Sequence, residues 1–323
     1  MAGKQDEVFS RKHTEEGNVT PEIGEVLYSL ENRRVRELLG AVDFRPNQLL
    51  LNAIYETLNK KSFGPVFSPV LQWFHHGVDV IQPDTEYESL VDLISKDSEF
   101  AKFAGDFLRQ ASTGVSDLKY ESRVFDRKNS PLPWDFLERI AKSAERSDPI
   151  FLRGPYGSEI RLNKQDGTLR IEMIKTGHLT AKGSRAELPL HEESDGTQRL
   201  LQLLPALFQL NKEPKVYFID ELDRSMHPLL AWEFLRAFLE KCEGCQHQLI
   251  LTTHECHLLD LELLRRDEIW FAEKNKHGAT ILYPLTDFNI RKDLKISKGY
   301  LQGRFGAIPF FGEPNLLIGK PCD

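Results

Sequence analysis

Residues 216–219, Val-Tyr-Phe-Ile, form a short apolar run that ends at two adjacent carboxylates, Asp220 and Glu221. An apolar run without polar alternation is typical of a strand buried on both faces of a parallel sheet. Ligands bind at the carboxyl ends of such strands, and paired charges there are costly unless a metal ion or a polar ligand uses them. The pattern predicts a ligand-binding sheet edge. The alternative is a strand followed by an Asp-Glu pair that caps a helix.

The residues around this run alternate between helix and strand patterns. The expected order is helix 197–210, strand 216–219, helix 228–241, strand 249–252, helix 258–265 and strand 268–272. This alternation indicates an α/β fold with a largely parallel sheet. Three earlier strand-like runs, at 151–152, 158–162 and 168–174, are separated by glycine-containing turns and predict a β-hairpin layer.

A histidine follows the second of the apolar strands. Residues 249–253 lead directly to His254. In a parallel sheet a neighbouring strand would place His254 beside Asp220 and Glu221, where it can donate a hydrogen bond to a phosphate. The alternative is a histidine that caps the helix expected next.

The helix expected at 197–210 begins with a second candidate ligand site. Ser194 and Asp195 are suitable capping residues, and Gly196 lets the backbone approach a ligand closely. Exposed amides at a helix N-terminus bind phosphate groups well. The alternative is a well-capped helix that binds nothing.

Length and sequence pattern divide the chain into three stretches. At 323 residues, two domains or one large domain with an insertion are expected. Residues 1–46 contain candidate strands at 8–12 and 19–26, and we interpret them as a remnant of the β layer of the C-terminal lobe. Residues 47–148 are expected to form an inserted α-helical subdomain, and residues 149–323 the α/β lobe. Within the insertion, apolar residues recur at helical spacing in the segments 50–58, 90–94, 100–108 and 134–144.

Composition excludes several classes of protein. With 40% apolar and 28% charged residues, the chain is neither disordered nor collagen-like. No stretch approaches the roughly 20 apolar residues that a membrane helix needs, and the charged first 25 residues lack the apolar region of a secretory signal. Four cysteines cannot form a disulfide framework for this length, so a cytoplasmic location is expected.

The charge balance argues against attraction of the whole surface to nucleic acid. The 42 basic and 49 acidic residues give a net charge of −7. A local basic cluster near the C-terminus is the candidate exception, although a solvated face is the simpler interpretation. Its members are Arg291, Lys292, Lys295, Lys298 and Arg304.

Cys242, Cys245 and His247 have spacing compatible with a zinc site that takes its fourth ligand from elsewhere. The strand that follows them spans about 20 Å or more, so His254 cannot join the same ion. The alternative is a helix-ending loop with buried thiols.

Four motifs occur in an order that resembles a known family. They are residues 194–198 (Ser-Asp-Gly-Thr-Gln, a signature loop), residues 216–221 (a Walker B strand), residues 223–228 (Asp-Arg-Ser-Met-His-Pro, a D-loop) and residues 252–254 (Thr-Thr-His, a switch histidine). The chain is similar to ATPases of the ABC superfamily, in the branch of the SMC/RecF-like and OLD-like proteins. Within that branch it resembles bacterial AAA-family ATP-binding proteins of the phage-defence type. Residues 298–309 resemble the C-terminal segment of proteins in that group.

The resemblance implies a role for each motif and the cofactors ATP and Mg²⁺. Asp220 would hold Mg²⁺, Glu221 would orient and deprotonate the attacking water, and His254 would contact the γ-phosphate. In a composite site between two heads, the signature loop would contact ATP in trans, and the D-loop would carry communication between the heads. The residues implied are Ser194, Asp195, Gly196 and Gln198 for the signature loop, and Asp223, Arg224, Ser225 and His227 for the D-loop. The implied partners are a second copy or an intact ATPase subunit, together with an effector protein; no membrane partner is expected.

One element of the family pattern is absent from the sequence. The phosphate-cradling loop G-x-x-x-x-G-K-[ST] occurs nowhere in the 323 residues. We expect the corresponding strand, loop and helix to lie before residue 1, and we predict that this chain alone binds ATP weakly or not at all. Two other functions stay open: a regulatory ATPase-like protein that acts by binding a partner, and a nuclease that uses Asp267 and Glu268.

Overall fold

The computed structural model describes the placement of much of the chain. The described residues are 9–13, 19–28, 33–34, 37, 51, 64–83, 89–124, 150–153, 159–165, 168–211, 214–242, 244–290 and 295–308. The chain divides into two compact units, residues 1–79 with 214–216 and residues 80–213 with 217–323. Within the described residues, no helix has both the length and the apolar character needed to cross a membrane.

The first unit begins with an antiparallel hairpin. Strand β1 (Phe9–His13) pairs with β2 (Val19–Ile23), which confirms the two strands expected in the first 46 residues. A 3-10 turn η1 (Glu25–Tyr28), helix α3 (Gly64–Gln72) and a π-helical turn η4 (Trp73–Gly77) follow. The helices expected at 50–58 and 134–144 lie outside the described residues, apart from Leu51.

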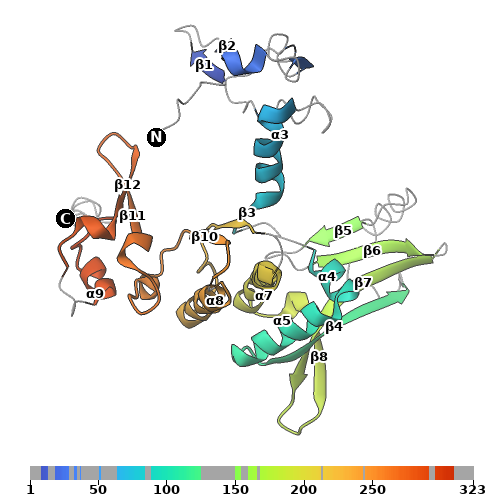
Figure 1. Ribbon diagram of the computed structural model, residues 1–323. Helices are drawn as coiled ribbons and strands as arrows, with labels where there is room; N and C mark the ends of the chain where they lie inside the picture. The colour runs from blue at the N-terminus through green and yellow to red at the C-terminus, as the bar shows by residue number, and fades with distance from the viewer. Residues whose placement is uncertain are drawn as a thin grey trace, which may run out of the picture. The chain divides into compact units, whose positions relative to one another are not determined.

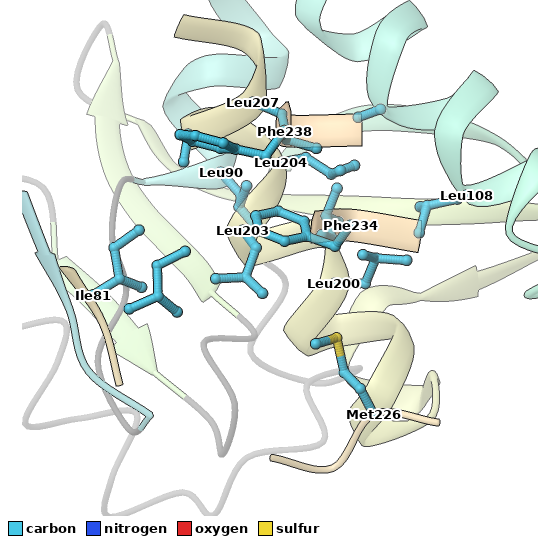
Figure 2. Packing of buried hydrophobic residues seen from close by; sticks show 14 of the residues in the cluster. Ile81, Leu90, Leu108, Leu200, Leu203, Leu204, Leu207, Met226, Phe234 and Phe238 are labelled. Carbon is cyan, nitrogen blue, oxygen red and sulfur yellow. The ribbon is translucent and has the colours of Figure 1, made fainter. Parts of the chain in front are cut away.

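Helix α7 (Asp195–Phe208) forms the centre of the second unit (Figure 1). Every residue from Thr197 to Leu207 is buried, so this helix is covered on all sides rather than along one stripe. It packs against α5 (Ser98–Gln110) and α8 (Pro228–Lys241), while α4 (Leu90–Lys96) contributes to the same core. Figure 2 shows Leu200, Leu203, Leu204 and Leu207 of α7 within this apolar cluster. The N-terminus of α7 is therefore held by a fully packed helix.

An antiparallel sheet forms the hairpin layer that the sequence predicts. Its strand order is β4-β7-β6-β5, and β8 pairs with β7. The strands are β4 (Val115–Val124), β5 (Ile150–Arg153), β6 (Glu159–Gln165), β7 (Thr168–Leu179) and β8 (Arg185–Pro189). Because β4 lies within 47–148, the expectation that this stretch is helical holds for α3, α4 and α5 but not for β3 and β4. Strand β4 gains its backbone partners from β7, more than 40 residues later in the chain.

A three-stranded sheet of order β10-β9-β3 carries the two acidic residues. It contains β3 (Val78–Ile81), β9 (Val216–Ile219) and β10 (Gln248–Leu251). At the ends of β9 and β10, the Thr252 amide donates to the Ile219 carbonyl, while the Thr252 carbonyl accepts from the Leu222 amide. One residue that bonds to two different residues of its neighbour is the pattern of parallel strands. The predicted strands 216–219 and 249–252, joined through helix α8, are confirmed.

The last part of the predicted alternation is wrong. Residues 258–265 form turns between two 3-10 turns, η8 (Cys256–Leu258) and η9 (Arg266–Glu268), instead of a helix. Leu258 packs in the large core and Leu259 against a second one, so the segment spans two cores and presents no single apolar stripe. The strand expected at 268–272 exists as β11 (Trp270–Lys274), but it pairs antiparallel with β12 (Thr280–Pro284).

The second core stabilises the C-terminal segment. Helix α9 (Ile296–Leu301) and a 3-10 turn η10 (Leu285–Asp287) close over the β11–β12 hairpin. Tyr283 Oη donates to the Phe305 carbonyl over 2.8 Å, and Tyr300 Oη donates to the Ala307 carbonyl over 2.9 Å. Residues 298–308 of the motif-like tail are therefore fixed by aromatic residues of this small core.

Candidate nucleotide-binding site

Asp220 and Glu221 lie directly after β9, as the sequence predicts. The Asp220 amide donates to the Ile81 carbonyl over 2.9 Å, which continues the sheet by one residue. Glu221 has a φ of +46°, a conformation that is uncommon for a residue with a side chain and that turns the chain out of the strand. The two carboxylates thus occupy a sharp turn at the sheet edge, where Asp220 is exposed and Glu221 is half-buried.

Thr252 joins both acidic residues. Its hydroxyl donates to Asp220 Oδ1 over 2.5 Å and accepts from the Glu221 amide over 2.9 Å. One hydroxyl from β10 therefore positions a side chain and a backbone group at the end of β9. The sequence pattern includes Thr252 in the switch motif but gives no sign of this contact.

The next two residues of the switch motif are tied to the D-loop. Thr253 Oγ1 donates to Asp223 Oδ1 over 2.6 Å, and the His254 amide donates to the same oxygen over 3.2 Å. His254 itself is exposed. Asp223, expected to act between two heads, has a bonded role within its own chain: it holds the backbone that presents His254.

The rest of the D-loop turns tightly toward helix α8. The Arg224 amide donates to the Glu221 carbonyl over 3.1 Å, and the Arg224 guanidinium lies 3.6 Å from Glu221 Oε2. Ser225 has a φ of +61° and is exposed. His227 Nδ1 accepts from the Leu229 amide over 3.2 Å and so caps α8. The D-loop is fixed at both ends and exposes Ser225 between them.

The signature loop is the capped start of α7. Ser194 Oγ accepts from the Thr197 amide over 3.2 Å, while Ser194 and Asp195 are exposed. A Cβ atom on Gly196 would lie 2.7 Å from the Ser225 carbonyl oxygen, so only glycine permits this approach of the signature loop to the D-loop. The predicted capping by Ser194 is present. The close approach at Gly196 is to protein backbone, and its approach to a ligand stays a prediction.

Glu193, the residue before the signature loop, is anchored by several hydrogen bonds. Its side chain, only 7% exposed, accepts from the Thr176 hydroxyl and lies 2.6 Å from His178 Nε2. Its carbonyl accepts from Gln198 Nε2 over 2.8 Å, while Gln198 Oε1 is buried and has no hydrogen-bond partner among the described residues. The signature loop is thus held from β7 on one side and from its own helix on the other.

Arg199 is a functional candidate that the sequence motifs do not identify. It is fully buried on α7, and its guanidinium donates to the Asp220 and Gln82 carbonyls over 3.3 Å each. A charged residue inside a leucine-rich helix is the signal that could have identified it, because a buried charge needs polar partners.

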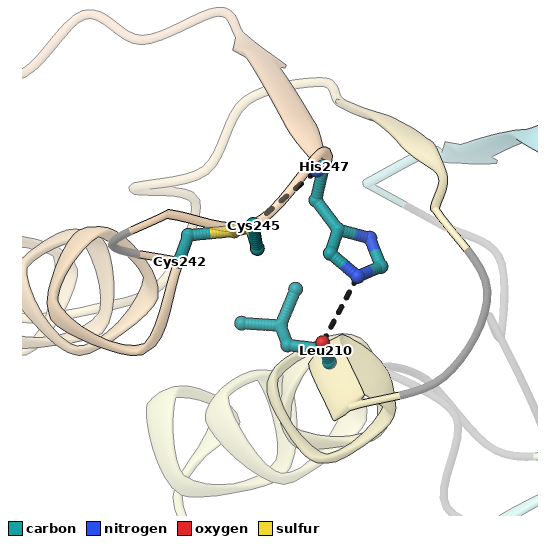
Figure 3. The surroundings of a disulfide bond; sticks show 4 residues. All are labelled: Leu210, Cys242, Cys245 and His247. Carbon is teal, nitrogen blue, oxygen red and sulfur yellow. Dashed lines mark hydrogen bonds between the residues drawn. A yellow bond between two sulfur atoms is a disulfide. The ribbon is translucent and has the colours of Figure 1, made fainter.

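The cysteine pair does not form the zinc site considered from the sequence. Cys242 and Cys245 form a disulfide with 4.9 Å between their Cα atoms, so neither sulfur is a thiolate ligand in this state (Figure 3). His247 Nε2 lies 2.9 Å from the Leu210 carbonyl, and the His247 ring stacks on Tyr217 of β9. The alternative of two buried free thiols is also wrong for this pair.

Of the basic cluster, Lys295, Lys298 and Arg304 are described and all three are exposed. Arg291 and Lys292 lie outside the described residues. Exposure suits a solvated face, and contact with nucleic acid stays a prediction.

The donor set at the sheet edge fits a magnesium–nucleotide complex. Mg²⁺ binds carboxylate and hydroxyl oxygens together with phosphate oxygens. The Asp220 and Glu221 carboxylates follow β9, and the Thr252 hydroxyl, just after β10, bonds the Asp220 carboxylate and the Glu221 amide. Carboxylate and hydroxyl oxygens fit a hard, oxygen-seeking cation.

A comparison with protein families identifies a matching family. A family model described as "AAA domain, putative AbiEii toxin, Type IV TA system" matches residues 52–260, more than half of the chain. The matched range contains the signature loop, both carboxylates, the D-loop and His254. A search of curated proteins gives no match.

Proposed function

The chain belongs to this family of AAA domains, a P-loop ATPase family, and we propose that it is the ATP-binding and ATP-hydrolysing head of an SMC/OLD-like ATPase. The observation that carries the proposal is the contact of Thr252 with both Asp220 and Glu221, which builds one oxygen-rich edge from two strands. The proposed setting is a bacterial defence system, in keeping with the toxin–antitoxin description of the family.

Each group at the edge has a proposed task. Asp220 holds the Mg²⁺ that accompanies ATP; when bound, this ion neutralises charge on the phosphate oxygens. Glu221 accepts a proton from the attacking water and orients it. His254, presented by the bond from its amide to Asp223, donates a hydrogen bond to the γ-phosphate. The hard oxygen ligands and the exposed positions of Asp220 and His254 support these tasks.

The signature loop is proposed to act on a nucleotide held by a partner. Ser194 and the amides of Asp195 and Gly196 begin a fourteen-residue helix, whose N-terminus favours phosphate. Ser194 Oγ accepts from the Thr197 amide and lies 2.9 Å from Thr197 Oγ1. In the proposed complex Thr197 Oγ1 donates in this second contact, which directs the Ser194 proton to a phosphate oxygen. Ser225, exposed beside Gly196, is proposed to contact the partner head, with Arg224 and His227 fixing the loop around it.

The phosphate cradle comes, in this proposal, from polypeptide outside the 323 residues, because they contain no G-x-x-x-x-G-K-[ST]. The test is a complex of this chain with an ATPase subunit that carries that loop. Phosphate release is measured for the complex and for each component alone. We expect hydrolysis by the complex and none by this chain alone; equal turnover by this chain alone would overturn the composite arrangement.

Glu221→Gln tests the chemistry in the same assay. It keeps the size of the side chain and removes the base, so we expect turnover to fall at least about 100-fold with little change in nucleotide affinity. Glu233→Gln, on α8 and paired only with Arg236 among its described ion pairs, is the matched control. If the two substitutions leave the same turnover, hydrolysis at this edge is ruled out.

A further inference from the structure

Three ligating side chains converge just after the switch histidine, at a place that the proposed ATPase does not use. Glu255, Cys256 and His257 are consecutive, and their carboxylate oxygen, sulfur and imidazole nitrogen lie within 4.8 Å of one another. Cys256 and His257 begin the 3-10 turn η8, and Glu255 is its N-cap. Consecutive residues of a 3-10 turn point about 120° apart, so convergence of the Cys256 and His257 side chains with Glu255 is not the default geometry.

The contact between Glu255 and His257 goes beyond a simple cap. The Glu255 carboxylate accepts from the His257 amide over 2.9 Å, which is sufficient to cap the turn. The His257 ring also turns toward the carboxylate, with 2.5 Å between Nδ1 and the same oxygen. Backbone capping does not require this second contact, which places a nitrogen ligand and an oxygen ligand side by side.

Cys256 completes the group as a free thiol. It is half-buried, while the Glu255 side chain is 17% exposed and His257 lies at the surface. The exposed His257 makes the group accessible to an ion from solvent. The Glu255 amide donates to Thr253 Oγ1 over 2.9 Å, so the turn is joined to the segment that presents His254.

We propose that Glu255, Cys256 and His257 bind a zinc ion, with water or another ligand in the fourth position. Carboxylate oxygen, thiolate sulfur and imidazole nitrogen are the three ligand types that zinc accepts, at about 2.0–2.3 Å. Zinc would replace a proton on His257 Nδ1 and the proton of the Cys256 thiol, and both protons would pass to solvent. The site is separate from Cys242 and Cys245, which are joined to each other.

Cobalt(II) titration tests the site, because a thiolate bound to cobalt gives a charge-transfer band that oxygen and nitrogen ligands do not. The full chain is used with Cys242 and Cys245 both replaced by serine, so that neither can bind the metal. We expect saturation at one cobalt per chain, displacement by zinc, and loss of the band in Cys256→Ser. Absence of the band in the protein that keeps Cys256, or its persistence in Cys256→Ser, would overturn the proposal.

His257→Ala gives an independent arm that does not endanger folding, since His257 is exposed. Zinc affinity, measured by competition with a chromophoric chelator, is expected to fall at least about tenfold. His277→Ala, another exposed histidine, in the β11–β12 turn, is the matched control and should leave the affinity unchanged. Equal affinities of the two variants would exclude His257 as a ligand. None of these measurements depends on ATP turnover.

Discussion

The guanidinium of Arg199 donates a hydrogen bond to the main-chain carbonyl of Asp220, with 3.3 Å between Nη2 and the oxygen. Arg199 belongs to the helix that begins with the signature loop, and Asp220 ends the strand that carries the carboxylates. A buried side chain therefore joins the two motifs within one chain. Because Arg199 is fully buried, this hydrogen bond is shielded from water.

Arg199→Met is expected to destabilise the protein and not only the site. The change leaves the Asp220 and Gln82 carbonyls without their charged donor. We expect the free energy of unfolding to fall by about 2 kcal/mol or more. Urea unfolding followed by circular dichroism measures it. Arg236→Met removes exposed ion pairs with Glu233 and Glu240 and a cation–π contact with Trp232, all on α8, and should cost less than about 1 kcal/mol. Similar losses in both variants would mean that Arg199 does not hold the strand end.

Thr252→Val isolates the contact that joins the two carboxylate residues. Valine keeps the shape of threonine but leaves the Glu221 amide and Asp220 Oδ1 without the hydroxyl. Because Thr252 is exposed, water can form some of the hydrogen bonds that the hydroxyl made. We therefore expect the free energy of unfolding to fall by about 1 kcal/mol or less. Affinity of the P-loop-containing complex for Mg·ATP should fall about tenfold. Thr280→Val on β12 is the control, and an affinity equal to that of the control would contradict the role of Thr252.

Gly196→Ala should separate the signature loop from the D-loop. The new Cβ would meet the Ser225 carbonyl at 2.7 Å, a distance that forces backbone to move. We expect a loss of about 1–3 kcal/mol in the free energy of unfolding. Gly105→Ala, in helix α5, is the control because its Cβ would have ordinary contacts from 3.4 Å outward and alanine favours a helix. If Gly196→Ala is as stable as Gly105→Ala, the two loops are not in close contact in solution.

Much of the local structure follows from sequence periodicity, and the errors have physical causes. The pattern predicts α8 to the residue and α7 within two residues at each end, because each has apolar positions at helical spacing and a recognisable cap. The sequence pattern does not predict strand β4, because residues 115–124 are rich in charged side chains and their partner strand lies far along the chain. Pairing of that kind is decided by tertiary structure and not by local preference.

The site could be predicted as an order of motifs but not as a set of contacts. The sequence shows an apolar run before Asp220 and Glu221 and another before His254. Parallel pairing of the two strands brings their ends together. The bonds made by Thr252 and Arg199 depend on which side chain faces which backbone group. No spacing rule encodes that choice.

His178→Ala tests whether the Glu193 anchor fixes the signature loop. Losing the 2.6 Å contact should cost about 1 kcal/mol locally, so the amides of Asp195 and Gly196 should exchange about five-fold faster. Hydrogen–deuterium exchange with mass spectrometry measures this. His178→Gln keeps a side-chain donor and should restore much of the protection, and His191→Ala, an exposed neighbour, should have no effect. Unchanged exchange in His178→Ala would exclude the histidine as an anchor.

Tyr283 makes the C-terminal core sensitive to alkali. Burial and the neighbouring Glu273 carboxylate raise the pKa of Tyr283 from about 10 to about 12. The folded state therefore holds the phenol proton more tightly than the unfolded state, so stability falls as the pH rises from about 10 to about 12. Tyr283→Phe should reduce stability by about 1 kcal/mol at neutral pH, by losing the bond to Phe305, and should flatten the alkaline decline. Urea unfolding across that range measures both effects. Glu273→Gln should move the Tyr283 titration, followed by tyrosinate absorbance, toward lower pH, and an alkaline decline equally steep without the Tyr283 hydroxyl would refute this origin.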